Sequence, residues 1–348
     1  MKRIHGGDWA AFQEEHGFLP LDFSANVSPL GVPPGVQEAI RHAAATADRY
    51  PDPAYRALHR ALGVYEGVPE DRVLCGGGAA DLIWRACLAA KPKRALVTAP
   101  CFGEYEAALE ACGCEPLRFP LGDDFVLTDR ILSWIGPNLD MLILCNPNNP
   151  TGRTADPSLL RAIVRRCGET GTRLLLDECF VVFLDEPEKH TVKPLLESTP
   201  SLLILRAFTK LWGMAGVRLG YALSADADFL DAMRRSGPPW SVSLPAQAAG
   251  LAALEERDYV DRVRALVRTE RPRLAAALQA LGLRVIPGEA NFLLFQCSRP
   301  LALPLQERGI LIRVCGDFHG LDESWYRCAV RTREENERLI AALKEVLL

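Results

Sequence analysis

The sequence predicts an α/β protein with a large, doubly wound, mostly parallel sheet domain and a smaller α+β domain. The first observation is a set of short, continuous apolar runs, which are typical of parallel strands buried on both faces. These runs are Arg94–Pro100, Met141–Pro147, Thr172–Glu178 and Leu202–Phe208. Helical patterns separate the runs, and such alternation predicts a parallel sheet. The alternation stops after about Trp240, which indicates a second domain built differently.

One helix between two of the runs is marked at both ends. Asp156 is placed to cap its start, Pro157 suits its first turn, and Gly171 ends it. The residues that form its apolar face are Leu159, Leu160, Ile163, Val164 and Cys167. This segment is expected to be the connecting helix of a βαβ unit.

The C-terminal part combines a long helical pattern over Ala246–Leu281 with short strands and a last helix over Glu334–Val346. The expected strands are Asn291–Phe295, Ile310–Val314 and Trp325–Arg331. We place an N-terminal arm that joins the small domain at 1–27, the large ligand-binding domain at 28–245 and the small domain at 246–348. The Pro- and Gly-rich Ser28–Gly35 is expected to lead from the arm into the large domain.

Composition and charge narrow the class of protein. The chain has 348 residues, of which 49% are hydrophobic and 24% charged, with a net charge of −4. This mild charge gives no electrostatic attraction to nucleic acid or to an anionic membrane. No apolar run approaches the roughly 20 residues that span a bilayer, and Met1–Gly17 lacks the apolar core of a signal peptide. We therefore expect a cytoplasmic protein with neither nucleic acid nor membrane as a partner.

The eleven cysteines are an odd count scattered through apolar segments. Cys112 and Cys114 are two residues apart, and neither a CxxC pair nor a His-rich cluster accompanies them. The pattern predicts no metal site and no disulfide framework. It indicates small buried side chains in a reducing compartment.

Polar clusters follow the predicted strands, at the edge where α/β sheets bind ligands. They are Asn146–Gly152, Asp177–Glu178 and Thr209–Lys210. A Gly-rich turn, Gly76–Asp81, precedes a helical pattern. The first N–H groups and the dipole of such a helix suit a phosphate group.

These clusters, in this order, resemble the motifs of the fold-type-I aminotransferases, which use pyridoxal phosphate (PLP). The resembling segments are Asn146–Gly152, Asp177–Phe180 and Thr209–Tyr221. The resemblance implies the PLP-dependent transferase fold of type I and pyridoxal 5′-phosphate as cofactor. It also implies that Lys210 is the catalytic residue, which holds the cofactor as a Schiff base and moves protons at the substrate Cα.

By the same resemblance, Asp177 pairs with the pyridine nitrogen and Asn149 donates to the phenolic oxygen. Phe102 stacks on the ring, unless it is simply a core residue. The residues implied to bind the cofactor phosphate are Gly78, Ala79, Ala80, Thr209 and Arg218, with Tyr50 reaching over from the neighbouring subunit. A homodimer with shared active sites is therefore expected.

Over essentially the whole chain, the sequence resembles two branches of this family: histidinol-phosphate aminotransferases and the L-threonine-O-3-phosphate decarboxylases of cobalamin biosynthesis. Several segments look more like the second branch, namely His5–Gly7, Asp22–Gly31, Arg49–Asp52, Phe180 and Ile310–Leu321. Three residues depart from common family patterns: Phe180 replaces a tyrosine, Ala207 a serine and Asp317 an asparagine.

The resemblance also implies a substrate site. Arg327, assisted by Asn26, would bind an α-carboxylate, since a bidentate arginine suits that group. The residues implied to bind a substrate phosphate are Arg313, His5 and Arg331. For His5 the alternative is an unstructured start of the chain, and for Arg331 it is a surface ion pair.

The leading hypothesis is a PLP-dependent lyase that decarboxylates L-threonine O-3-phosphate to (R)-1-amino-2-propanol phosphate. The alternative is transamination of histidinol phosphate with 2-oxoglutarate. A regulatory PLP-binding domain fused to a DNA-binding module is a third class, but the segment before Asp22 is too short for a winged helix. The sequence leaves open which bond at the substrate Cα is broken.

Overall fold

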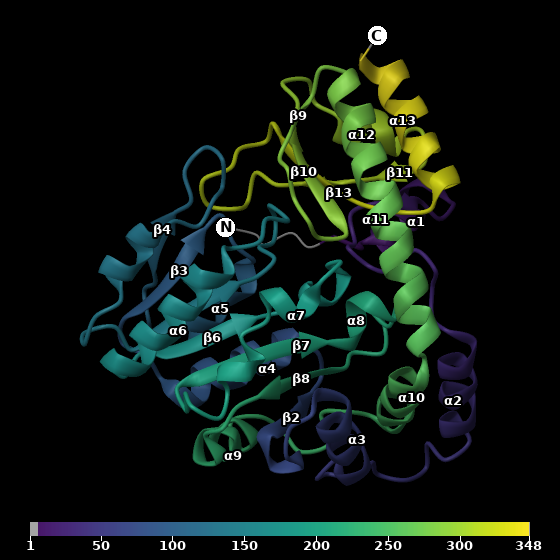
Figure 1. Cartoon of the computed structure of the whole chain (residues 1–348). Coiled ribbons are helices and arrows are strands. Elements are labelled where there is room, and N and C mark those ends of the chain that lie inside the picture. Colours follow the sequence, from purple (N-terminus) through teal and green to yellow (C-terminus); the bar gives the residue numbers. More distant parts are fainter. Residues whose placement is uncertain (1–5, 348) are drawn as a thin grey trace.

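The computed structural model describes residues 6–347, and its largest unit is a seven-stranded sheet in the order β2-β8-β7-β6-β5-β3-β4 (Figure 1). The strands are β2 (Val73–Gly76), β3 (Ala95–Ala99), β4 (Leu117–Pro120), β5 (Met141–Cys145), β6 (Arg173–Asp177), β7 (Leu202–Ala207) and β8 (Gly220–Leu223). In this sheet β8 pairs antiparallel with β2 and β7, and the other strand pairs are parallel. The predicted doubly wound, mostly parallel sheet is thus confirmed, and the four apolar runs form β3, β5, β6 and β7.

The sheet is buried on both faces because alternate residues of each strand enter different cores. In β5, Leu142 and Leu144 pack with one core, and Met141 and Ile143 pack with the other. The first core includes side chains of α3 (Arg56–Glu66) and α6 (Pro157–Thr170), and the second those of α4 (Ala79–Ala90), α5 (Gly103–Ala111) and α9 (Ala227–Arg235). This two-sided burial explains why the strands read as continuous apolar runs.

The connecting helix α6 begins and ends as predicted. The Asp156 carboxylate accepts hydrogen bonds from the backbone N–H groups of Ser158 and Leu159, at 2.8 and 3.1 Å. Gly171 ends the helix in the left-handed conformation, with a φ of 73°. Both end signals are local in the sequence, which is why they could be read from it.

A second sheet carries the C-terminal part, with four antiparallel strands in the order β12-β13-β10-β9. They are β9 (Arg284–Val285), β10 (Phe292–Gln296), β12 (Arg313–Val314) and β13 (Trp325–Ala329). Its core includes side chains of α11 (Arg257–Ala280), α12 (Ala302–Gln306) and α13 (Arg333–Leu347). Short β1 (Leu21–Asp22) pairs in parallel with β11 (Ile310–Leu311), so the N-terminal arm lies against the C-terminal part. The domain boundaries near residues 27 and 245 stay predictions.

Two predicted elements are divided in the structure. The strand expected at Ile310–Val314 is β11 plus β12, which pair with different sheets on either side of buried Ile312. The helix expected at Ala246–Leu281 is α10 (Leu244–Glu255) plus α11, because the Glu256 backbone leaves the helical region at ψ 58°. As Figure 1 shows, α10 packs beside α2 (Pro34–Ala44), while α11 continues to the small sheet.

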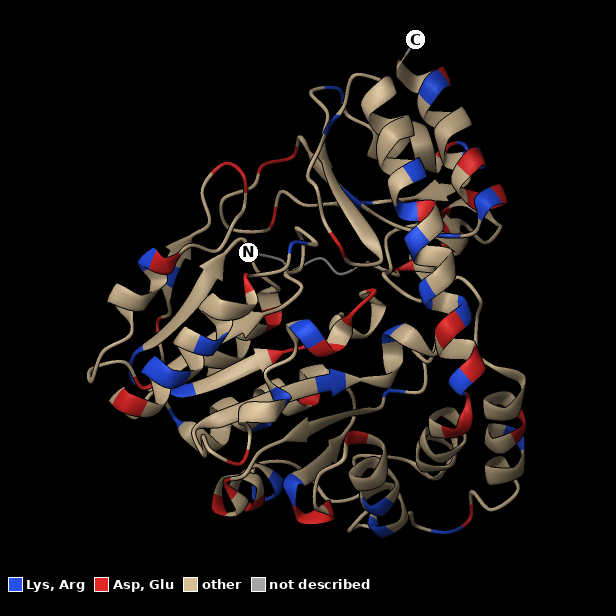
Figure 2. Cartoon of the chain, viewed as in Figure 1, with Lys and Arg blue, Asp and Glu red and all other residues tan. Residues whose placement is uncertain are grey.

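Three further α-helices are α1 (Trp9–His16), α7 (Pro187–His190) and α8 (Phe208–Leu211), and short 3-10 helices lie at Glu70–Arg72, Asp129–Trp134, Val181–Phe183 and Lys193–Leu195. Between residues 6 and 347, no helix is both long enough and apolar enough to cross a membrane. Charges of both signs are spread over helices and loops and alternate along α11, whereas the strands are mostly uncharged (Figure 2).

Candidate active site

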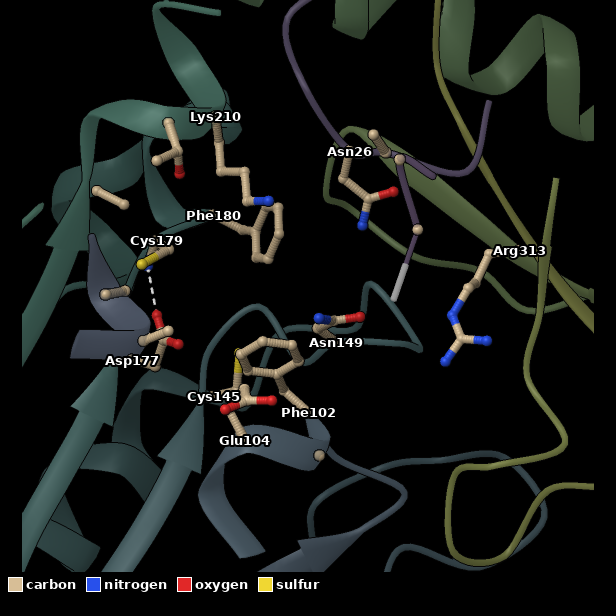
Figure 3. A pocket seen from close by; sticks show the side chains of 18 of the residues that line it. Asn26, Phe102, Glu104, Cys145, Asn149, Asp177, Cys179, Phe180, Lys210 and Arg313 are labelled. Carbon is tan, nitrogen blue, oxygen red and sulfur yellow. Dashed lines mark hydrogen bonds between the residues drawn. The ribbon is translucent and has the colours of Figure 1, made fainter. Parts of the chain in front are cut away.

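A cavity of about 790 Å³ lies where the carboxyl ends of β5, β6 and β7 meet the small sheet. It brings together residues predicted from distant parts of the sequence. The predicted residues that line it are Asn26, Ala79, Ala80, Phe102, Asn149, Asp177, Thr209, Lys210, Arg218, Arg313 and Arg327. In Figure 3, Lys210 and Arg313 enter from opposite sides, with Asn26 and Asn149 between them.

Lys210 lies on α8, directly after β7, and its side chain points into the cavity (Figure 3). Its backbone carbonyl accepts a hydrogen bond from Ser28 N at 2.9 Å, but its Nζ has no hydrogen-bond partner within residues 6–347. Burial lowers the pKa of Lys210 from 10.5 to about 8, and the positive charge of Arg327 adds to this effect. An amine that loses its proton this readily is suited to form a bond with a carbonyl carbon.

Asp177 is the last residue of β6, and both of its carboxylate oxygens are bound. One accepts from the Tyr105 hydroxyl at 2.7 Å and the other from Cys179 N at 2.9 Å. Burial, together with the charge of Asp177, holds the pKa of Tyr105 well above its usual range, so that hydroxyl stays a donor. Sequence reasoning missed Tyr105; the available signal was its position one helical turn after Phe102.

The start of α4 forms a cradle for an anion. Gly78 precedes it with a φ of +100°, and a Cβ there would lie 2.7 Å from Nη2 of Arg218. No side chain caps this helix, so the N–H groups of Ala79 and Ala80 remain available beside that guanidinium. Thr209 is buried and also lines the cavity. Exposed helix N–H groups beside a cation bind phosphate.

Two side chains next to Lys210 complete this half of the cavity. The Asn149 oxygen accepts a hydrogen bond from Nη1 of Arg327, which leaves the Asn149 NH₂ group as the donor toward the cavity. Phe180 is buried, and its ring centre lies 6.0 Å from Nζ of Lys210. A phenylalanine ring offers no hydrogen bond there, so Asn149 provides the side-chain amide donor in this region.

The small sheet contributes two buried arginines, Arg313 and Arg327, which are direct cross-strand partners on β12 and β13. Arg327 Nη2 donates to the Ser24 carbonyl at 3.0 Å, while its buried Nε has no hydrogen-bond partner between residues 6 and 347. Burial lowers the pKa of Arg327 from 12.5 to about 10, and the charge of Arg313 contributes to this shift. Arg313 Nη2 lies 2.6 and 2.7 Å from the two carboxylate oxygens of Asp317.

Asn26 lies between the two halves of the cavity. It is buried, and its side-chain oxygen has no hydrogen-bond partner within the described residues. Its backbone carbonyl accepts from Asn291 at 3.2 Å, which holds the segment in place. A buried polar atom without a partner, facing a cavity, is suited to bind a ligand.

Two predicted residues, Tyr50 and Arg331, lie away from the cavity lining. Tyr50 is 80% exposed and packs on Trp240, with ring centres 4.8 Å apart, so it does not reach the cavity of its own chain. Arg331 forms an ion pair with Glu335 at 2.7 Å and donates to the Asp22 carbonyl, away from the cavity lining. His5 lies outside the described residues.

The fold and this arrangement of lysine, carboxylate, amide and glycine cradle define a PLP-dependent enzyme of fold type I. Residues 20–343 match the family model "Aminotransferase class I and II", and the chain belongs to this family. Its cofactor is pyridoxal 5′-phosphate, and the cradle at α4, the buried carboxylate of Asp177 and the buried lysine amine fit that group.

The particular relatives divide between two activities. The chain is 40% identical to the threonine-phosphate decarboxylase of Salmonella typhimurium, with 99% of this chain and 96% of the relative covered. It is 37% identical to the histidinol-phosphate aminotransferase of Symbiobacterium thermophilum, with 96% and 93% covered. Among solved structures, it is similar to the histidinol-phosphate aminotransferase of Sinorhizobium meliloti in complex with pyridoxal-5′-phosphate, with a TM-score of 0.87, 27% identity, and 99% and 95% covered.

Proposed function

We propose that this enzyme decarboxylates L-threonine O-3-phosphate to (R)-1-amino-2-propanol phosphate, as a lyase of cobalamin biosynthesis. The observation that carries the proposal is the 40% identity, over almost the whole of both chains, to a threonine-phosphate decarboxylase. The cavity supports it because two buried arginines, Arg313 and Arg327, line it together with Lys210, as a substrate with two anionic groups requires.

The large sheet would hold the cofactor. Lys210 would bind it covalently, Asp177 would keep its ring nitrogen protonated, and Asn149 would donate to its phenolic oxygen. Bound PLP supplies an electron sink for the electron pair left at the substrate Cα when a bond there breaks. Phe102 would stack on the ring. The residues that would bind its phosphate are Gly78, Ala79, Ala80, Thr209 and Arg218.

The small sheet would orient the substrate. Arg327 would bind the α-carboxylate with help from Asn26, and this contact selects which Cα bond is aligned for cleavage. Arg313 would bind the phosphate at the far end. The Cα–carboxylate bond then breaks, the carboxylate leaves as CO₂, and Lys210 delivers the proton that replaces it. The pKa of about 8 suits Lys210 to gain and lose a proton near neutral pH.

Transamination of histidinol phosphate with 2-oxoglutarate is the second candidate, favoured by the 37% identity to a histidinol-phosphate aminotransferase. Histidinol phosphate would bring a phosphate, and 2-oxoglutarate would bring two carboxylates, to Arg313 and Arg327. The two reactions therefore use the same binding groups and differ in the bond that breaks at Cα.

The test is incubation of the purified holoenzyme with L-threonine O-3-phosphate and no keto acid. We expect many equivalents of CO₂ and aminopropanol phosphate per enzyme, with the cofactor spectrum restored at the end. Accumulation of the amine form of the cofactor would contradict the proposal. Turnover of histidinol phosphate that depends on added 2-oxoglutarate, without CO₂ release from threonine phosphate, would establish the second candidate.

We also propose that two copies of the chain share their active sites through Tyr50, whose ring is exposed next to Trp240. Mixing inactive Tyr50→Ala and Lys210→Ala variants would then restore part of the activity, because each hybrid dimer contains one intact site. Absence of recovery after proven subunit exchange would show that Tyr50 serves no site in the partner.

A further inference from the structure

The two substrate-side arginines form an unfavourable pair in the absence of an anion. Arg313 and Arg327 are directly opposite on β12 and β13, and both line the same cavity. Only 5% of Arg313 and 6% of Arg327 are exposed, so water screens their charges weakly. Like charges directly opposite on neighbouring strands destabilise a sheet, and burial increases that cost.

Only one of these two positive charges is paired with a negative charge from the described residues. The described partners of Arg327 are neutral oxygens, from Ser24 and Asn149. Arg313 instead pairs with the Asp317 carboxylate, both of whose oxygens lie within 2.7 Å of Nη2. Within residues 6–347, this is the only carboxylate in an ion pair with either arginine. Asp317 therefore acts as the counter-ion of the pair.

Asp317 presents to Arg313 the same chemistry that a substrate phosphate would present. It offers two anionic oxygens to one guanidinium nitrogen, and it lines the cavity on that side. Arg313 has supports that do not depend on Asp317, because it also donates to the Val314 carbonyl and lies 5.2 Å from the centre of the Phe318 ring. Its guanidinium is thus held in place while its anionic partner is exchanged.

We propose that Asp317 is an internal counter-ion that occupies Arg313 in the free enzyme and competes with the distal phosphate of the substrate. Asp317 is then a specificity-determining residue that sets how tightly the phosphorylated end binds. The inference rests on the proposed function in that it assigns the substrate phosphate to Arg313. The carboxylate lowers affinity for phosphate, and in exchange it stabilises the two arginines when no substrate is bound.

A purely structural role for Asp317 leads to the opposite expectation. If Asp317 only orients Arg313 for the phosphate, its removal weakens phosphate binding. If it competes, its removal strengthens phosphate binding and lowers the melting temperature of the ligand-free enzyme. The sign of the change in affinity separates the two roles.

The experiment compares the holoenzyme with Asp317→Asn and Asp317→Ser, since two different replacements guard against a defect peculiar to one. Calorimetric titration with inorganic phosphate should show a dissociation constant about tenfold lower in both, equivalent to about 1.4 kcal/mol. The KM for L-threonine O-3-phosphate should fall by a similar factor. Binding of unphosphorylated L-threonine, followed by the cofactor spectrum, should stay within about twofold of the wild-type value.

Two controls locate the effect. Asp322→Asn removes the same charge from an exposed position five residues further on, and should leave phosphate affinity unchanged. The double variant Arg313→Met, Asp317→Asn should bind phosphate no more tightly than Arg313→Met alone, because the competition needs both partners.

Weaker or unchanged phosphate affinity in folded Asp317→Asn and Asp317→Ser would overturn the inference. An equal increase in phosphate affinity when Asp317→Asn is added to Arg313→Met would also overturn it. Phosphate titration requires no turnover, so it is independent of the reaction assay. Tighter phosphate binding in an enzyme that releases no CO₂ from threonine phosphate would support the inference while refuting the proposed reaction.

Discussion

Asp177 and Arg327 are both buried charged residues that line one cavity, yet they differ in how fully their polar atoms are hydrogen-bonded. Both oxygens of Asp177, at the end of β6, accept hydrogen bonds at 2.7 and 2.9 Å. Arg327, on β13, has a buried Nε without a described partner and faces another arginine across the strand pair. The buried side-chain oxygen of nearby Asn26 likewise has no partner among the described residues.

The difference matches how long each ligand is expected to stay. A cofactor that remains bound favours a carboxylate fixed in advance by its own donors. A substrate that arrives and leaves needs charges that it can satisfy itself, so the protein tolerates some unpaired groups there. We infer that the large sheet carries the chemistry and the small sheet selects the substrate.

The largest effect is expected on the cofactor side, at Lys210. Lys210→Ala should lower turnover by about 10⁴-fold, because it removes both the attachment point and the proton carrier. Borohydride reduction of the wild-type enzyme, followed by peptide mapping, should place the cofactor on the peptide that contains Lys210. Lys189→Ala, at an exposed lysine, is the matched control and should be fully active. A label on Lys193 or Lys189 would refute the assignment.

Asp177 and Glu178 are adjacent, but replacing Asp177 should lower turnover, whereas replacing Glu178 should lower the stability of the fold. Asp177→Asn should reduce turnover at least about 100-fold, or about 3 kcal/mol, with little change in melting temperature. Glu178 is buried and pairs with Arg206 at 2.8 Å, outside the lining of the cavity. Glu178→Gln should destabilise the fold by about 3 kcal/mol. The measurements are steady-state kinetics and thermal unfolding of both variants. Normal turnover in Asp177→Asn would show that the catalytic carboxylate has been misassigned.

On the small sheet, Arg327→Gln should raise the KM for threonine phosphate about 30-fold, because a charged hydrogen bond to the carboxylate is lost. The reaction should also become less selective, with some cofactor converted to its amine form as the carboxylate loses its fixed orientation. Steady-state kinetics and the cofactor spectrum report the two effects. An unchanged KM would remove Arg327 from the substrate site.

The cofactor side and the substrate side of the cavity should also be coupled, because the charge of Arg327 affects the pKa of Lys210. Burial and the charge of Arg327 lower the pKa of Lys210 to about 8, so its amine is mainly protonated below pH 8 and neutral above it. Since the neutral amine reacts with PLP, the rate of cofactor capture by the apoenzyme should rise about tenfold per pH unit up to pH 8 and then level off. Arg327→Gln should move the midpoint upward. A midpoint near 10.5 in the wild type would contradict the coupling.

Sequence patterns anticipated that the residues proposed for the cofactor would line one cavity, because they lie at or after the ends of parallel strands. Asp177 is the last residue of β6, Lys210 follows β7 by three residues, and such strand ends meet at one edge of a sheet. Tyr105 was missed because its hydrogen bond to Asp177 spans 72 residues and depends on how α5 packs on the sheet.

The substrate side was harder to predict because it depends on strand pairing. The motif resemblance pointed to Arg313 and Arg327, but their cross-strand register follows from the division of Ile310–Val314 into β11 and β12. No local signal marks that division, or the helix break at Glu256. The ion pair between Arg331 and Glu335 follows a common helical spacing, yet only the structure shows that it lies away from the cavity.

The most direct test of the division is a crystal structure of the Lys210→Ala variant with PLP and L-threonine O-3-phosphate bound. We predict the substrate carboxylate within about 3 Å of the Arg327 guanidinium and the phosphate at a similar distance from Arg313. The Asp317 carboxylate should have moved off Arg313. A substrate bound in the reverse direction, with its carboxylate on Arg313, or one that contacts neither arginine, would contradict the account.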